Sequence, residues 1–414
     1  MNIFAILYVY PPLQTPATMC YVKLLEGLQK NGCQVTVLTV NPDSFYFPGG
    51  KTVDPDLLRL LPKGMVNHAV WSWEGNPVVR HLQENDLSHR LLHRFFEPRK
   101  VEWTYPAKRL LDQLDFSGFD LILSCSQPHC NHLLGSYLKR RTGKPWLAYF
   151  SDPWTDNVYA NFRSEKILDY NRRLEGEVIR DADSVMFTTE EMKNLVMKKY
   201  PAEWAAKCGS LPHSFVPEWY ELEQAPQEVK KAELTLIHTG HFYGPRTPQP
   251  LLHALARLNS KAPLAGRLEV RLYGTMEQQY RDYIDANLAE VVTVRAPVPY
   301  LQSLAAMRQA DYLLLVDAPL AGTNESVFLP SKLVDYLGSG RPIIGITPRH
   351  GASARVLTET GNMVCDVLDQ EDICRLLESV VTGAACPQLV PQAMEGYSCT
   401  EVARTIQAVI ERVR

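Results

Sequence analysis

The sequence lacks four features that would each have indicated a class of protein. Its 9 cysteines include no C-x-x-C pair, which excludes the common paired-cysteine zinc and redox motifs and, with an odd total, favours reduced thiols. Neither half contains the G-x-G-x-x-G fingerprint of dinucleotide-binding proteins, which argues against a NAD-dependent oxidoreductase. No apolar run approaches the roughly 18 residues of a membrane span. The net charge of −3 shows no excess of one sign, so nothing points to nucleic acid as a partner.

What is present is the composition of a globular protein. The 414 residues are 45% hydrophobic and 21% charged, enough for two domains with cores of their own. The chain opens on an apolar run that lacks a basic segment before it and leads directly into Tyr10-Pro11-Pro12. We therefore expect a buried strand there and not a signal peptide. We expect a cytoplasmic protein, which could also bind peripherally to the inner face of the cell membrane.

Apolar runs typical of buried parallel strands alternate with segments whose apolar residues recur at helical spacing. The alternation stops at an acidic, proline-containing stretch, residues 217–231, and then restarts. The pattern predicts two successive α/β halves joined by a linker. The predicted strands are residues 3–10, 34–40, 65–71, 120–126, 146–150, 184–188 and 208–211 before the linker, and residues 234–239, 268–273, 291–294, 312–316, 343–346 and 363–365 after it.

Residues 323–346 carry the clearest functional signal. A polar loop leads into Pro330 and Ser331, which open a predicted helix. The first N–H groups of a helix have no intrahelical partner and bind anions, and Lys332 would add positive charge to them. Asp335, one turn later, could accept hydrogen bonds from sugar hydroxyls. Phosphate plus hydroxyls suggests a nucleotide-sugar, whereas the alternative is an ordinary strand–helix crossover with a solvated lysine and aspartate.

Polar side chains also follow predicted strands of the first half. His129, His132 and Asp152 come after two such strands, and the carboxyl ends of parallel strands are where α/β sheets place ligands. The alternative is that these residues cap helices or bind loop backbone. Cys125 and Cys130 stand beside the two histidines, but their spacing fits no closed zinc pattern, so we expect no metal.

Residues 80–108 interleave Arg, His and Lys with Leu, Phe and Trp. Such a segment can lie at a lipid interface or hold an anionic, lipid-linked acceptor. The alternative is a long surface helix that packs its apolar residues inward and exposes a basic face.

Four segments together resemble the retaining glycosyltransferases of family 4. Residues 8–12, Tyr-Val-Tyr-Pro-Pro, and the helix after them look like the start of that family's acceptor domain. Residues 126–129 and 150–154, the latter Phe-Ser-Asp-Pro-Trp, look like a subgroup with an Asp-Pro-Trp loop. Residues 239–246 resemble the first donor-domain loop, and residues 330–342, the most specific segment, resemble the donor motif. The resemblance spans nearly the whole chain.

The resemblance implies the GT-B fold, in which two Rossmann-like α/β domains face each other across a cleft. It implies an acceptor-binding domain at residues 1–220, a nucleotide-sugar-binding domain at residues 221–395, and a C-terminal helix at residues 396–414 that crosses back to the N-terminal domain. The expected enzyme is a metal-independent, cofactor-free retaining hexosyltransferase (EC 2.4 class). It would move a sugar from a nucleoside-diphosphate donor, most commonly a UDP-sugar, to a saccharide or lipid-linked saccharide in cell-surface polysaccharide or glycolipid synthesis.

The resemblance also implies roles for individual residues. The residues expected to act at the reacting groups are Arg246, Lys332, Glu325 and His129. The expected donor-binding residues are Gly240, Tyr243, Asn324, Ser331, Leu333 and Asp335. The expected acceptor-side residues are Pro12, Thr15, His132, Asp152 and Trp154.

One position departs from the family. The donor motif usually carries two glutamates eight positions apart, whereas here the second position is Asp335 and Val327 stands eight residues before it. Glu325 is the nearest carboxylate, and Asn324 could share its role. This displacement keeps open the alternative of a catalytically silent binding subunit of a polysaccharide assembly complex. A nucleotide-sugar epimerase of the same fold is a second alternative, which would need acid and base residues on either side of the sugar.

Overall fold

The chain folds into two compact units, each built on a parallel sheet. The computed structural model describes residues 1–46, 53–85, 87–88, 91–92, 99–160, 162–225, 229–320 and 322–413. Unit 1 comprises Met1–His213 with Cys399–Arg414, and unit 2 comprises Ser214–Ser398. Both are Rossmann-like α/β domains, as the alternating pattern predicted. Of the basic segment 80–108, residues 86, 89, 90 and 93–98 lie outside the described residues.

Unit 1 contains a seven-stranded parallel sheet in the order β3-β2-β1-β4-β5-β6-β7. Its strands are β1 (Asn2–Ile6), β2 (Gln34–Val40), β3 (Val66–Val70), β4 (Leu121–Ser126), β5 (Trp146–Phe150), β6 (Ser184–Phe187) and β7 (Cys208–Ser210). Its helices include α1 (Pro16–Lys30), α2 (Pro77–Glu84), α4 (Val101–Leu111), α5 (Cys130–Thr142), α6 (Glu165–Asp181), α7 (Glu190–Met197) and α15 (Cys399–Val413). The strand order reverses between β1 and β4, and the carboxyl ends of such a strand pair are the usual ligand position of an open α/β sheet.

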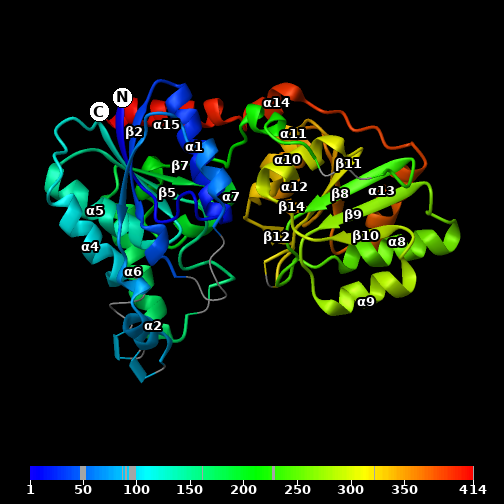
Figure 1. The fold of residues 1–414 in the computed structure, drawn as a ribbon, viewed down its shortest axis with the longest axis horizontal. Coiled ribbons are helices and arrows are strands. Elements are labelled where there is room, and N and C mark those ends of the chain that lie inside the picture. Colours follow the sequence, from blue (N-terminus) through cyan, green and yellow to red (C-terminus); the bar gives the residue numbers. More distant parts are fainter. Residues whose placement is uncertain are drawn as a thin grey trace. The chain divides into compact units, whose positions relative to one another are not determined.

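The C-terminal helix α15 belongs to unit 1 and packs against α1 (Figure 1). A Cβ on Gly27 of α1 would lie 1.9 Å from the carbonyl oxygen of Cys399, so the two helices meet where α1 has no side chain. Asn31, at the end of α1, donates through Nδ2 to the carbonyl of Thr400 at 2.9 Å. The last segment of the chain therefore completes the first unit.

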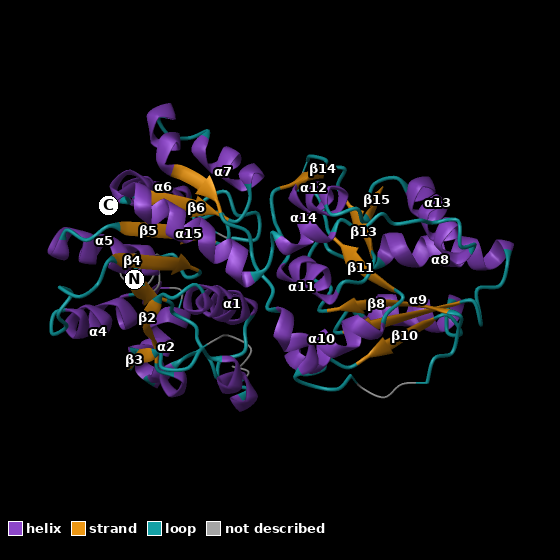
Figure 2. Ribbon diagram, turned by 90° about the horizontal axis from the view of Figure 1, so that it is seen from above, coloured by secondary structure: helices purple, strands orange, loops and turns teal. Residues whose placement is uncertain are grey.

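Unit 2 contains a six-stranded parallel sheet in the order β10-β9-β8-β11-β13-β15 and a separate pair, β12 and β14. Its strands are β8 (Leu234–Thr239), β9 (Leu268–Tyr273), β10 (Val292–Arg295), β11 (Tyr312–Val316), β12 (Glu325–Ser326), β13 (Ile343–Thr347), β14 (His350–Gly351) and β15 (Met363–Asp366). Its helices include α8 (Gln249–Lys261), α9 (Gln278–Asn287), α10 (Tyr300–Gln309), α11 (Ser331–Ser339), α12 (Ala352–Glu359), α13 (Gln370–Val381) and α14 (Pro391–Glu395). Figure 2 shows α8 and α13 on one side of these strands and α10 and α11 on the other. The order reverses between β8 and β11.

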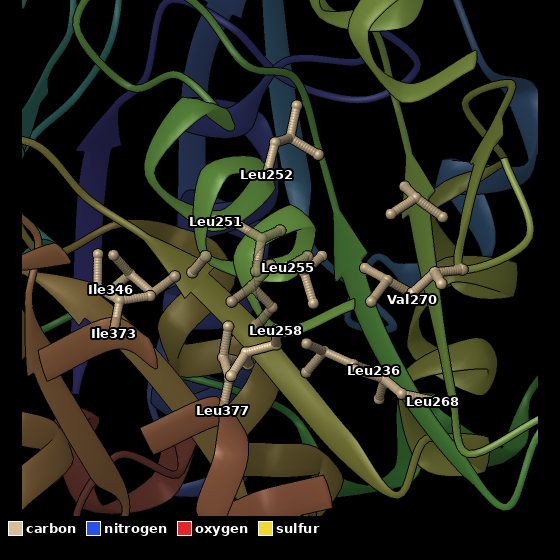
Figure 3. Close-up of a cluster of buried hydrophobic side chains, with 14 of the residues drawn as sticks. Leu236, Leu251, Leu252, Leu255, Leu258, Leu268, Val270, Ile346, Ile373 and Leu377 are labelled. Atoms are coloured by element: carbon tan, nitrogen blue, oxygen red, sulfur yellow. The ribbon is translucent and has the colours of Figure 1, made fainter. Parts of the chain in front are cut away.

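The core under α8 holds the unit 2 sheet in place. Leu251, Leu255 and Leu258 recur at a spacing of three to four residues, so one face of the helix is apolar. They lie against Leu236 of β8 and Val270 of β9, with α13 closing the cluster (Figure 3). Each buried leucine contributes about 1.5–3 kcal/mol. In the described part of the chain, no helix combines the length and the apolar character that crossing a bilayer requires.

Candidate functional site

Two glycine loops form the carboxyl edge of the unit 2 sheet. Gly240 follows β8 with φ +115°, and Gly274 follows β9 with φ +145°, conformations that favour glycine because other residues carry a Cβ. A Cβ on Gly274 would lie 2.2 Å from the carbonyl oxygen of Gly240, so the loops pack backbone against backbone. The N–H of Gly240 donates to the carbonyl of Tyr273 at 2.8 Å, which fixes the first loop to the neighbouring strand.

Lys332 reaches the Gly240 loop from the first turn of α11. A Cβ on Gly240 would lie 2.7 Å from Lys332 Nζ, so the ammonium group occupies the space that a side chain would need. Lys332 Nζ also lies 3.4 Å from His238 Nε2. His238 Nδ1 lies 2.9 Å from the carbonyl oxygen of Leu314. Because a carbonyl can only accept, Nδ1 carries the imidazole proton and Nε2 faces the lysine as an acceptor.

Arg246, in the loop between β8 and α8, supplies the second cation. Its Nε donates to Asp317 Oδ1 at 2.9 Å and its Nη1 donates to Tyr243 Oη at 3.0 Å. The guanidinium carbon lies 5.7 Å from the ring centroid of Phe328. The side chain of Arg246 is 13% exposed and that of Asp317 is fully buried. The guanidinium is therefore held in one orientation at the edge of the protein surface.

Asp317 stands immediately after β11, on the other side of the strand-order reversal from Gly240. Its Oδ1 also accepts the N–H of Ala318 at 2.9 Å, while its Oδ2 accepts from Ser326 Oγ at 2.9 Å and Ser353 Oγ at 3.0 Å. These hydrogen bonds and the ion pair with Arg246 replace the water that a buried carboxylate loses. Sequence reasoning missed Asp317, although its position directly after a predicted strand was a usable signal.

The cations influence each other. Burial, and after it the neighbouring Arg246 guanidinium, lower the pKa of Lys332 to about 7, although Asp317 acts in the opposite direction. Burial, and after it Lys332, also lower the pKa of His238 well below its ordinary value. Lys332 therefore gains or loses a proton near neutral pH, and a bound anion would favour its charged form.

Helix α11 provides the predicted helix N-terminus, which begins at Ser331 without a side-chain cap. Two other predicted donor residues on this helix are buried. Leu333 is fully buried and its N–H donates to the carbonyl of Pro330 at 2.9 Å, so its side chain belongs to the core and not to a ligand surface. Asp335 is 5% exposed, and its Oδ1 accepts from Tyr300 Oη at 3.0 Å. Tyr300 therefore already uses one oxygen of the carboxylate that was expected to bind a ribose.

Glu325 and Asn324 lie in the loop before α11. Glu325 is exposed in β12, which pairs with β14 outside the main sheet. Asn324 donates through Nδ2 to Asp366 Oδ2 at 3.3 Å, whereas its Oδ1 is buried and has no hydrogen-bond partner among the described residues. Asn324 thus offers a buried, unused acceptor, and Glu325 an exposed carboxylate.

In unit 1, the loops after β4 and β5 bring predicted residues together. The rings of His129 and Trp154 stack with centroids 4.7 Å apart and 5° between their planes. Asp152 Oδ2 accepts from Gln127 Nε2 at 3.0 Å. Burial lowers the pKa of His129 to about 3, and within the described structure its buried Nδ1 has no hydrogen-bond partner. At neutral pH His129 is therefore an uncharged imidazole that can form hydrogen bonds, and not a positively charged general acid.

Two expected acceptor-side residues are buried. His132 is fully buried, with its Nδ1 2.9 Å from Ser124 Oγ. Trp154 is 3% exposed and donates through Nε1 to Asn171 Oδ1 at 2.7 Å. Nε2 of His132 is also buried and has no hydrogen-bond partner among the described residues, so His132 lies in the core, and its contact with an acceptor stays a prediction. Trp154 supports the site through its stack with His129.

Of the five expected acceptor-side residues, Pro12 and Thr15 remain, and they lie after β1, the neighbour of β4. Pro12 is partly buried. Thr15 caps α1, since its Oγ1 accepts the N–H of Thr18 at 3.0 Å. Tyr21 of α1 donates through Oη to the carbonyl of Gln127 at 3.2 Å, which ties this helix to the loop after β4.

No protein-family model matches the chain, and no curated protein matches it in sequence. Solved structures match over its full length. The chain is similar to sucrose-phosphate synthase from Thermosynechococcus elongatus, at 12% identity and a TM-score of 0.61 over 100% of this chain and 98% of that one. It is similar to HepE of Anabaena, solved in complex with UDP-glucose, at 12% identity and a TM-score of 0.58 over 100% of both chains. A putative UDP-N-acetylglucosamine 2-epimerase from Listeria monocytogenes matches at 14% identity and a TM-score of 0.57 over 99% and 95%. The protein thus has the two-domain GT-B fold found among glycosyltransferase structures.

Proposed function

We propose that the protein is a glycosyltransferase that moves a hexosyl group from a nucleoside-diphosphate sugar to a hydroxyl acceptor with retention of configuration. The observation that carries this proposal is the pair of cations in unit 2, Arg246 and Lys332, beside the Gly240 loop and the start of α11. A departing nucleoside diphosphate develops negative charge, which preorganised cations and N–H groups stabilise. The UDP-glucose bound to HepE favours a UDP-sugar as the donor.

The two cations would bind the diphosphate in different ways. The forked guanidinium of Arg246 suits two phosphate oxygens at once, while Lys332 acts as a point charge. The bond between the anomeric carbon and the phosphate oxygen breaks as the acceptor oxygen bonds to the same face of that carbon. The acceptor proton passes to the leaving phosphate oxygen. This route uses no protein nucleophile.

Other residues would orient the sugar and the acceptor. The buried acceptor atom of Asn324 and the carboxylate of Glu325 suit hydroxyls of the donor sugar, and Asp335 with Tyr300 suits the ribose. On unit 1, His129 and Asp152 would meet the acceptor.

We propose a saccharide or a lipid-linked saccharide as the acceptor, in cell-surface polysaccharide or glycolipid synthesis. The basic composition of residues 80–108 supports lipid linkage and peripheral membrane contact. Arg80 contributes little to that surface, because it donates to the backbone carbonyls of Glu74 at 2.9 Å and Gly75 at 2.8 Å.

The test is release of nucleoside diphosphate from a panel of nucleotide-sugars, with and without oligosaccharide acceptors. Replacing Arg246 by Ala should lower the rate by about 100-fold or more. It also leaves the buried Asp317 carboxylate without its ion pair, so the unfolding temperature should fall, and rates are compared at a temperature where the variant is fully folded. Arg257→Ala is the matched control, since Arg257 is an exposed arginine of the same unit whose partner is Glu371. Its rate should stay unchanged.

Three outcomes would contradict the proposal or part of it. Turnover by Arg246→Ala at the wild-type rate would remove Arg246 from the site. Failure of the wild-type protein to release diphosphate from any donor would favour a silent binding subunit. Conversion of the donor into its epimer would favour an epimerase.

A further inference from the structure

The carboxylate of Asp317 joins four segments of unit 2. It contacts Arg246 in the loop after β8, Ser326 in β12 and Ser353 at the start of α12, and it stands itself at the end of β11. Asp317 is fully buried, and its two oxygens accept four hydrogen bonds, so the carboxylate has a fixed position. An exposed arginine could adopt many rotamers, but Arg246 is bonded at Nε to Asp317 and at Nη1 to Tyr243.

The same carboxylate also acts on two like charges, the Arg246 guanidinium that it contacts and the Lys332 ammonium whose charged form it favours. Among the charged groups, Arg246 lowers the pKa of Lys332 and Asp317 raises it, while Lys332 in turn lowers the pKa values of His238 and His241. Of these, Asp317 is the acid. Without its charge, the two cations would repel each other inside a partly buried site, and Lys332 would lose its proton more readily.

We infer that Asp317 is a positioning residue of the donor site, which holds the Arg246 guanidinium in place and supplies the counter-charge that lets both cations act on one diphosphate. The inference rests on the proposed function, because it assumes that a nucleoside diphosphate binds beside Arg246 and Lys332. Asp317 is fully buried and does not itself touch the donor. It acts through the two cations.

Asp317→Asn separates this role from simple packing. Asparagine has nearly the same size and keeps a carbonyl oxygen for Arg246 Nε, but it carries no charge. Since a nearby carboxylate favours the charged ammonium, its removal should lower the pKa of Lys332 below its present value of about 7. The ammonium would then be lost at lower pH, and with it affinity for the diphosphate.

The matched control is Ser353→Ala. It removes one hydrogen bond to Asp317 Oδ2, 3.0 Å in length, and leaves all charges in place. If the carboxylate only becomes less well held, this variant should bind UDP more weakly at every pH. The pH at which the affinity falls should stay that of the wild type.

The experiment measures UDP binding by titration calorimetry from pH 5.5 to 8.5 in buffers of different ionisation enthalpy. Near pH 7, the wild-type protein should take up a fraction of a proton when it binds UDP. Above that pH its affinity for UDP should fall by about tenfold per pH unit, because Lys332 loses its charge. In Asp317→Asn the loss should begin about one pH unit lower, whereas in Ser353→Ala it should stay where it is in the wild type. The ionisation of UDP itself is common to all three proteins.

Two results would count against the inference. Affinity that falls equally at every pH in Asp317→Asn would overturn the counter-charge role, because the pKa of Lys332 would then not depend on Asp317, and it would leave only the positioning of Arg246. An unchanged affinity would overturn both roles. Failure of the wild-type protein to bind UDP at any pH is a different result, because it would remove the donor site and the inference together. UDP binding without any glycosyl transfer would leave the role of Asp317 in diphosphate binding supported and contradict only the proposed reaction.

Discussion

Gly240 shows how much of the site depends on single atoms. Its φ of +115° strains any residue with a Cβ, and that Cβ would lie 2.7 Å from Lys332 Nζ. The ammonium group therefore has its place because the loop has no side chain there. Gly266 has a φ of +76° in the same unit, and a Cβ added to it would have no neighbouring atom within 4 Å, so it carries the backbone constraint without the contact.

Replacing Gly240 by Ala should reduce both stability and donor binding. We expect a loss of about 1–3 kcal/mol in the free energy of unfolding from the strained φ, and weaker UDP binding by about tenfold or more because Lys332 is displaced. Thermal unfolding and UDP titration measure the two effects. Gly266→Ala should lose stability but keep the UDP affinity of the wild type. Unchanged UDP affinity in Gly240→Ala would mean that Lys332 does not need its present position.

At the scale of elements, the contact between α1 and α15 explains how the end of the chain joins the first unit. Gly27 lies where the helices meet, and the Cys399 carbonyl occupies the position of its missing side chain. A glycine inside a helix normally weakens it by about 1 kcal/mol relative to alanine. Its presence in α1 is accounted for by the close approach of α15.

Gly27→Ala should therefore destabilise unit 1, against the trend of helix propensity. A Cβ would lie 1.9 Å from the Cys399 carbonyl oxygen, so α15 must shift, at a cost of about 1–3 kcal/mol. Chemical denaturation followed by circular dichroism measures this change. Gly118→Ala is the control, because nothing lies within 4 Å of the added carbon, and it should be neutral or slightly stabilising. A stabilised Gly27→Ala protein would show that α15 does not pack tightly on α1.

For the whole molecule, buried histidines determine how stability depends on pH. Burial lowers the pKa values of His129 and His213, both in unit 1, to about 3. Between pH 6.5 and 3 the unfolded chain binds these protons and the folded unit does not, so stability falls as the pH falls below 6.5. Burial raises the pKa of Glu102 to about 7. Between pH 7 and 4.5 the folded protein binds the Glu102 proton and the unfolded chain does not, so Glu102 raises the stability as the pH falls. This effect cancels the destabilising effect of about one of the two histidines.

The pH dependence of His213→Gln tests this account. Each such histidine contributes a slope of about 1.4 kcal/mol per pH unit, so the variant should lose stability less steeply than the wild type between pH 6.5 and 5. Denaturant titrations at several pH values measure the slope. His350→Gln is the control, because His350 is exposed and should leave the slope unchanged. Equal slopes in all three proteins would contradict a neutral, buried His213.

Local patterns were sufficient to predict the two α/β halves and some of the elements that form the candidate site. An apolar run or a helical period is a property of neighbouring residues, so the strands around Gly240 and the helix that begins at Ser331 could be predicted. Lys332 was predicted from its residue type and its place in the first helical turn, whereas Arg246 was predicted from the resemblance of residues 239–246 to a donor-domain loop. Their meeting at one sheet edge is a fact of the structure, whereas their role at a diphosphate remains a prediction.

The tertiary structure alone decided which side chains meet and which are buried. Asp317 pairs with Arg246 across 71 residues, and Lys332 lies beside His238 across 94, because the strand order places β8 and β11 next to each other. No local spacing encodes that order. Burial follows the same logic: His129 and His132 are three residues apart on one helix start, yet His132 lies fully in the core, because the direction of a side chain depends on what packs against its helix.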